Sequence, residues 1–160
     1  MSTVYLGLGS NMGDKEGNIK KAISLLSDLG VVVKASKLYL TEPVGFKDQE
    51  WFLNIIVLLE TDLDPYRLLD AVQSIEKSMG RVRVRRYEPR VIDIDILFYD
   101  DLVIDDESLT IPHPRLHERR FILEAMLDLN PCLKHPVNGK TIEELYHECR
   151  DHSMVKPYDN

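Results

Sequence analysis

Residues 51–65, WFLNIIVLLETDLDP, combine a strongly apolar strand pattern with the start of a helix. Ile55 to Leu59 is the longest apolar run in the chain, and its β-branched residues favour a buried strand. Asp64 then provides a helix N-cap, and Pro65 takes the first helical position, where its missing N–H is not needed. The stretch therefore predicts a central strand that is followed directly by a helix.

Similar patterns on both sides of this stretch extend it to a βαββαβ order. We expect strands at residues 3–8, 31–40, 51–60 and 91–99, a first helix from Asp14 to Gly30 and a second helix from Asp64 to Gly80. This order is typical of the α+β ferredoxin-like core, an antiparallel sheet with helices on one face. We expect a C-terminal hairpin (102–104 with 109–111) and helices at 118–129 and from Thr141 to be added to it.

Length and composition favour one domain over residues 1–160. Of these residues, 44% are hydrophobic and 29% charged, and no repeat or linker is visible. No apolar run is long enough to span a bilayer, and the start MSTVYLGLGS lacks the basic region of a signal peptide. The two cysteines, Cys132 and Cys149, are typical of reduced thiols. We therefore expect a cytoplasmic monomer without a membrane partner.

The arginines are concentrated in one part of an acidic chain. The net charge is −7, yet eight of the ten arginines lie between Arg81 and Arg120, a window without lysine. The net charge argues against a nucleic-acid partner, and no suitable aromatic stretch indicates an RNA-binding sheet. Arginine can bind phosphate through two parallel hydrogen bonds, which favours a small polyanion. A solvated charged loop or a charged strand edge is the alternative.

Two aspartates follow this arginine segment within VIDIDIL, residues 91–97. Because alternate residues of a strand face opposite sides, Asp93 and Asp95 share one face and the isoleucines are buried on the other. Aspartate is rare in strands, and two like charges repel unless a cation neutralises them. Mg²⁺ binds a few carboxylates together with substrate phosphates. The motif therefore favours a metal and phosphate site over a solvated acidic face.

The glycine-rich stretch GLGSNMG, residues 7–13, does not fit a nucleotide-binding loop. Its glycines do not have the G-x-G-x-x-G spacing, no acidic residue ends the second strand, and no G-K-[ST] follows. We expect a tight turn between strand and helix in which Ser10 and Asn11 bond to backbone.

Four further side chains are candidates for ligand contacts. Phe52 and Asn54 share one face of their strand, and a buried amide without a partner costs about 1–3 kcal/mol. Asn54 therefore bonds either to backbone or to a flat heterocycle that stacks on Phe52. Phe121 lies off the apolar stripe of its helix and either faces a ligand or packs on the sheet. His113, between two prolines, favours a metal or phosphate contact over a solvent-exposed position.

Together these motifs resemble the 6-hydroxymethyl-7,8-dihydropterin pyrophosphokinase family, almost end to end. The motifs are GLGSN (7–11), YLTEPVG (39–45), FLN (52–54), GRVR (80–83), PRVIDIDIL (89–97) and PHPRLHERRF (112–121). The resemblance implies a single pterin pyrophosphokinase domain that transfers pyrophosphate from ATP to the hydroxymethyl group of 6-hydroxymethyl-7,8-dihydropterin. The products would be AMP and the pterin diphosphate, in folate biosynthesis. A non-catalytic nucleotide-sensing module on the same fold is the alternative.

The resemblance also implies roles for individual residues. Asp93 and Asp95 would bind two Mg²⁺ ions along the triphosphate, and they form the expected catalytic set with Arg81 and Arg90. The expected ATP contacts are Gln73, Glu76, Arg81, Arg83, Arg86, Arg90, Thr110, His113 and Arg119. The expected pterin contacts are Thr41, Val44, Phe52, Asn54 and Phe121. In this arrangement the two phenylalanines enclose the pterin ring, and Asn54 binds its edge.

Overall fold

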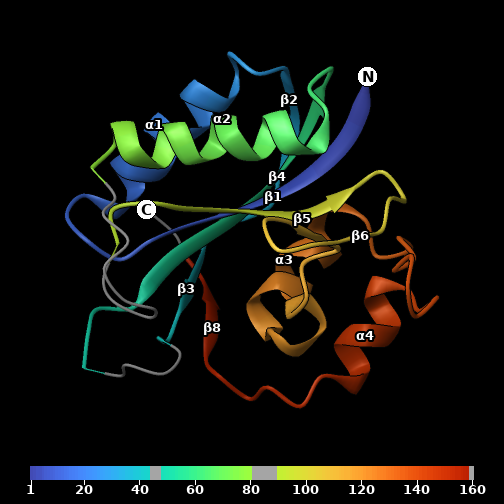
Figure 1. The fold of residues 1–160 in the computed structure, drawn as a ribbon. Helices are drawn as coiled ribbons and strands as arrows, with labels where there is room; N and C mark the ends of the chain where they lie inside the picture. Colours follow the sequence, from blue (N-terminus) through green and yellow to red (C-terminus); the bar gives the residue numbers. More distant parts are fainter. Residues whose placement is uncertain (44–47, 81–89, 159–160) are drawn as a thin grey trace.

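A six-stranded antiparallel sheet lies between two pairs of helices (Figure 1). The computed structural model describes residues 1–43, 48–80 and 90–158. The strands of the sheet are β1 (Ser2–Ser10), β2 (Val31–Ala35), β3 (Tyr39–Thr41), β4 (Phe52–Thr61), β5 (Asp93–Tyr99) and β8 (Val155–Pro157). The helices are α1 (Lys15–Leu26), α2 (Pro65–Ser78), α3 (Arg120–Leu129) and α4 (Ile142–Glu148). None of these helices is of a length and apolar character that could cross a membrane.

The strand order confirms the predicted ferredoxin-like core. The order is β5-β1-β4-β3-β8, and β2 pairs with β4 beside β3. Because β2 and β3 pair with successive parts of β4, they act as two halves of one interrupted edge strand. The predicted hairpin is present as β6 (Ile104–Asp105) and β7 (Thr110–Ile111), and the 3-10 helix η1 (Leu116–Glu118) precedes α3.

Ser36 interrupts the edge strand that the sequence predicts as continuous from 31 to 40. Its hydroxyl accepts a hydrogen bond from the backbone N–H of Ile56 at 3.0 Å, and its own N–H donates to the carbonyl of Ile56 at 2.8 Å. The side chain thus takes a donor that a strand carbonyl would otherwise bind. The pairing stops at β2 and resumes at β3.

The helices begin where the sequence indicates. The Asp14 side chain accepts from Gly17 N–H at the start of α1, and Asp64 accepts from two N–H groups of α2. Thr141 and Glu144 form a capping box at α4. The first helix, expected to continue to Gly30, ends at Leu26.

Alternation along the strands divides the core into two clusters, one on each face of the sheet. In β1, Val4, Leu6 and Leu8 are buried under α1 and α2, whereas Tyr5 is buried under α3 and α4. Gly7 and Gly9 follow on the same face as Tyr5. Gly7 still lies opposite Ile56 in the cluster under α3 and α4, whereas Gly9 lies opposite Asn54, beyond the residues of that cluster. This part of the face carries the candidate site.

Candidate active site

Strand register places the predicted metal and pterin residues side by side. Asp93 of β5, Gly9 of β1 and Asn54 of β4 are direct cross-strand neighbours, so their side chains belong to one face. Gly9 is needed here, because a Cβ atom on it would lie 2.6 Å from Asn54 Oδ1 and 3.5 Å from Phe52 Cδ1. The absence of a side chain therefore lets Phe52 and Asn54 lie close to β1, next to the strand that carries Asp93.

The polar part of the predicted pterin site is preformed. Asn54 Nδ2 donates to Thr41 Oγ1 at 2.6 Å, and the two residues are 9% and 3% exposed. Asn54 thus has a side-chain partner, Thr41, where the sequence left open a backbone group or a ligand. Phe121 is half-buried in the first turn of α3 and packs partly against the cluster under that helix. Val44 lies outside the described residues.

Arg90 contacts both halves of the candidate site. Its Nη1 lies 2.8 Å from Asp93 Oδ2, in an ion pair whose two side chains are each 18% exposed. Its Cζ lies 6.0 Å from the centroid of the Phe52 ring, within the range of a cation–π contact. The guanidinium is therefore located between the predicted metal carboxylates and the predicted pterin residues. The other loop arginines of the prediction, Arg81, Arg83 and Arg86, lie outside the described residues.

Asn11 joins the segments that flank these two halves. Its Oδ1 accepts from Arg90 N–H at 2.7 Å, and its own N–H donates to the carbonyl of Arg90 at 3.1 Å. Its Nδ2 donates to Gln49 Oε1 at 2.7 Å and to the carbonyl of Glu50 at 3.2 Å. The sequence predicts backbone bonds for Asn11, but no sequence signal gives these distant partners. The side chain, 2% exposed, holds β1, the start of β4 and the approach to β5 together.

Glu76 supports β5 between the two aspartates. Its Oε2 accepts from the backbone N–H of Ile94 at 2.8 Å, and the residue is 2% exposed. Gln73 is half-buried one turn earlier in α2. The nucleotide contacts expected for both residues stay predictions.

His113 lies within electrostatic range of Asp93 and is neutral at pH 7. Burial lowers its pKa to about 4; the positive charges of Arg119 and Arg115 act in the same direction, whereas Asp93 opposes them. Its Nδ1 accepts from Arg115 N–H at 3.2 Å, which leaves the proton of the neutral ring on Nε2. His113 can therefore donate a hydrogen bond to an anion, which suits a phosphate contact better than a metal contact.

Two further predicted ATP contacts belong to the same segment as His113. Arg119 is half-buried, and none of the ion pairs found among the described residues involves its guanidinium. Thr110 is half-buried in β7, where it pairs with Asp105. Because no ion pair was found for Arg119 among the described residues, its guanidinium suits the binding of an external anion.

Asp93 and Asp95 fit a divalent cation that the substrate helps to bind. Their positions two residues apart on one strand place the two Cα atoms roughly 6–7 Å apart. Within the described parts of the chain, no group of three or more His, Cys, Asp or Glu side chains could hold a metal ion. Mg²⁺ accepts one or two carboxylates when phosphate and water oxygens complete its shell. The donor set therefore suits magnesium delivered together with a phosphorylated substrate.

Known proteins resemble this chain over most of its length. A family model described as 7,8-dihydro-6-hydroxymethylpterin-pyrophosphokinase (HPPK) matches residues 5–131. The chain belongs to the HPPK family. A 2-amino-4-hydroxy-6-hydroxymethyldihydropteridine pyrophosphokinase of Methylorubrum extorquens is 44% identical over 146 residues, which are 90% of this chain and 91% of the relative.

Other HPPK relatives are longer. The folic acid synthesis protein fol1 of Pneumocystis carinii is 45% identical over 155 residues, which cover 96% of this chain and 21% of the relative. The chain thus spans about a fifth of that fungal protein. The crystal structure of wild-type Plasmodium falciparum HPPK-DHPS with pterin and p-hydroxybenzoate superimposes with a TM-score of 0.74. That match covers 92% of this chain and 43% of the other at 21% identity, and it supports the fold.

Proposed function

We propose that this chain transfers the pyrophosphoryl group of ATP to the hydroxymethyl oxygen of 6-hydroxymethyl-7,8-dihydropterin and releases AMP. Membership of the HPPK family supports this reaction. The position of Arg90, between Asp93 and Phe52, is the structural observation that carries it. In the same proposal the enzyme uses two Mg²⁺ ions and works in the cytoplasm as a step of folate biosynthesis.

The pterin contacts follow from the β3–β4 part of the site. Phe52 offers a flat aromatic surface, and Phe121 would enclose the ring from α3. Asn54 and Thr41 present an amide and a hydroxyl that are fixed by their mutual hydrogen bond. Such groups match the alternating donors and acceptors on the edge of a pterin. Rigid placement of this kind lowers the entropy lost on binding.

The phosphate contacts follow from β5 and the 113–119 segment. Asp93 and Asp95 would hold the two Mg²⁺ ions, which neutralise and orient phosphate oxygens when bound. The Nε2–H of His113 and the guanidinium of Arg119 would donate to other phosphate oxygens. The His113 ring is oriented by its bond from Arg115 N–H before the substrate arrives, which is the arrangement that stabilises developing charge at low cost.

The chemical step requires alignment more than acid–base chemistry. The hydroxymethyl oxygen forms a bond to the β-phosphorus, and the bond from that phosphorus to the bridging oxygen breaks, so that AMP leaves with this oxygen. The hydroxyl proton passes to solvent. Arg90 lies where the two substrates would meet, and its positive charge would stabilise the oxygens of the transferred group.

A mass-resolved assay tests the proposal. The chain is incubated with Mg²⁺ and ATP, with and without the reduced pterin alcohol. We expect AMP and the pterin diphosphate in equal amounts, and AMP only when the pterin is present. ATP binding without AMP formation would instead support the nucleotide-sensing alternative, and ATP hydrolysis independent of the pterin would also contradict the proposal.

A further inference from the structure

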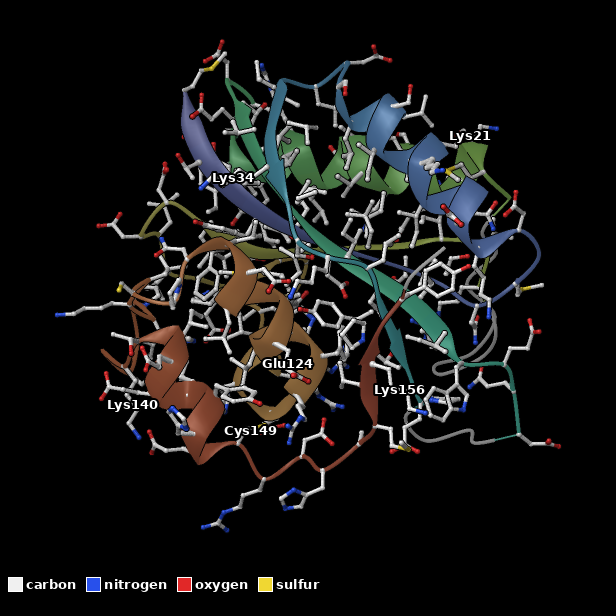
Figure 2. All side chains as sticks on the ribbon, turned by 180° about the vertical axis from the view of Figure 1, so that it is seen from behind. Lys21, Lys34, Glu124, Lys140, Cys149 and Lys156 are labelled. Carbon is white, nitrogen blue, oxygen red and sulfur yellow. The ribbon has the colours of Figure 1, made fainter. Side chains whose placement is uncertain are left out.

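The last described residues, 151–158, form a strap that returns from α4 to the edge of the sheet (Figure 1). In Figure 2, Cys149 marks the end of α4, and the chain runs from there past α3 to Lys156 on β8. The HPPK family match ends at residue 131, before this strap begins. The strap contains none of the residues expected to contact either substrate.

Asp151 fixes the first turn of α3. Its Oδ2 accepts from Arg120 N–H at 3.0 Å, and its Oδ1 accepts from Ser153 N–H at 2.9 Å. Arg119, the residue before α3, has no capping hydrogen bond from its own side chain. The carboxylate thus acts as a cap from a distant part of the chain. Burial raises the pKa of Asp151, but these hydrogen bonds outweigh it and lower the pKa overall, which keeps the carboxylate charged.

The strap then fixes β3. Met154 N–H donates to Glu42 Oε1 at 2.9 Å, and Glu42 N–H donates to the carbonyl of Met154 at 3.2 Å. From there β8 pairs with β3 in antiparallel register, with Val155 opposite Thr41. A third contact places Lys156 Nζ 5.9 Å from the ring centroid of Trp51.

Each of these contacts lies at, or next to, a residue expected to bind the pterin. Arg120 precedes Phe121, Val155 pairs with Thr41, and Trp51 precedes Phe52. Phe121 belongs to α3, whereas Thr41 and Phe52 belong to the sheet, so the width of the pterin site depends on how α3 sits relative to β3. The strap is bonded to both.

We propose that the strap holds the two walls of the pterin site at a fixed separation, with Asp151 as its positioning residue. This inference rests on the proposed function. A ring bound between two walls loses affinity when one wall can move, because ordering that wall becomes part of the cost of binding. ATP is expected to bind mainly through β5 and the 113–119 segment, and among the strap contacts described above only the bond to Arg120 adjoins one of these residues, Arg119. Loss of Asp151 should therefore weaken pterin binding selectively.

The test compares Asp151→Ala with Asp64→Ala, a matched variant that removes the cap of α2, a helix on the opposite face of the sheet from α3. Dissociation constants for the pterin and for Mg·ATP and the melting temperature are measured for both variants and the wild type. We expect Asp151→Ala to raise the dissociation constant for the pterin about five-fold and that for Mg·ATP less than two-fold. Asp64→Ala should lower the melting temperature by a similar amount but change neither dissociation constant. Asp151→Asn, which keeps one acceptor oxygen, should restore part of the pterin affinity.

A second pair of variants tests the other end of the strap. Glu42→Ala removes the acceptor for Met154 N–H, and we expect the double variant with Asp151→Ala to lose less pterin affinity than the two single losses combined. The proposal would be overturned if the variants lost pterin and ATP affinity equally, or if the loss of affinity followed the melting temperature in all variants. Fully additive losses of pterin affinity in the double variant would also overturn it. If Asp151→Ala does not fold, Glu42→Ala and Asp151→Asn provide the test, through the change in pterin affinity relative to the change in ATP affinity. A wild type that binds ATP but no pterin would instead refute the proposed function, and the role of the strap with it.

Discussion

Gly9 allows the side chains of Phe52 and Asn54 on β4 to lie close to β1. A methyl group at this position would lie 2.6 Å from Asn54 Oδ1, a distance that forces the amide to move. We predict that Gly9→Ala weakens pterin binding about ten-fold, because Asn54 would lose its alignment with Thr41. Titration with the pterin in the presence of a non-hydrolysable ATP analogue measures this. Gly7→Ala is the matched control, since its Cβ would meet Leu97 at an ordinary 3.5 Å; equal losses in both variants would contradict the explanation.

Arg90 is expected to act on the transferred group rather than on ground-state binding. We predict that Arg90→Ala slows single-turnover transfer about 100-fold or more, whereas the affinity for Mg·ATP changes by less than about five-fold. The same variant also frees Asp93 from its ion pair. Rapid-quench measurement gives the single-turnover rate, and nucleotide titration gives the affinity for Mg·ATP, so that the effect on transfer is separated from the effect on binding. An unchanged transfer rate would refute the role given to Arg90.

For individual residues, the sequence predicts which side chains share a face of a strand but not which distant residues they bond to. The two-residue period of a strand is sufficient to place Asp93 with Asp95, and Phe52 with Asn54. Contacts between distant segments have no such local signal. The bonds between Asn11 and Arg90 join residues far apart in the chain, and they depend on how β1 and β5 pair. The ion pair between Arg90 and Asp93 was likewise not predicted, because arginine in a loop has many possible partners.

Asn11 connects three elements, and its substitution should affect both substrates. Asn11→Ala removes the acceptor for Arg90 N–H and the donor to Gln49 and Glu50. We predict a loss of about 1–3 kcal/mol in the free energy of unfolding and weaker binding of both ATP and pterin. Urea unfolding and substrate titrations measure these quantities.

Asn11→Asp separates the two sides of this junction. Aspartate keeps an acceptor for Arg90 N–H but has no donor for Gln49 or Glu50, so pterin binding should suffer more than ATP binding. Asn18→Ala is the matched control, because the hydrogen bonds found for the Asn18 side chain among the described residues lie within the same β1–α1 turn, to Ser10 and Met12. If Asn18→Ala reproduces the losses, the junction has no special role.

The elements themselves were largely predictable, since long periodic segments and caps such as Asp14, Asp64 and Thr141 carry strong local signals. Two features were not. The break at Ser36 arises because one hydroxyl competes with the backbone for Ile56 N–H, and nothing in the apolar pattern marks it. The three-residue strand β8 is too short for a period, and it exists because β3 offers a free edge.

For the molecule as a whole, His113 should make stability depend on pH. Its pKa is lowered from 6.5 to about 4 in the folded state, mainly by burial. A histidine with a depressed pKa contributes its full stability above pH 6.5, and this contribution is lost as the pH falls towards 4, because the unfolded chain takes up the proton first. The loss amounts to about 3 kcal/mol at most.

Unfolding by urea between pH 7 and pH 4, in buffer with a chelator, measures this dependence. We predict that His113→Gln reduces the fall in stability across this range compared with the wild type. His152→Gln, at an exposed position outside the site, provides the control and should follow the wild type. Parallel curves for His113→Gln and the wild type would show that the imidazole is not buried in its neutral form.

The two carboxylates on β5 are the residues on which the proposed magnesium site depends most directly. Asp93 and Asp95 are replaced together by asparagine, and formation of AMP and pterin diphosphate is followed by mass spectrometry over a range of Mg²⁺ concentrations. We predict a folded protein whose turnover falls at least about 1,000-fold and is not restored by excess magnesium. Product formation at the wild-type rate and with the wild-type dependence on magnesium would contradict it.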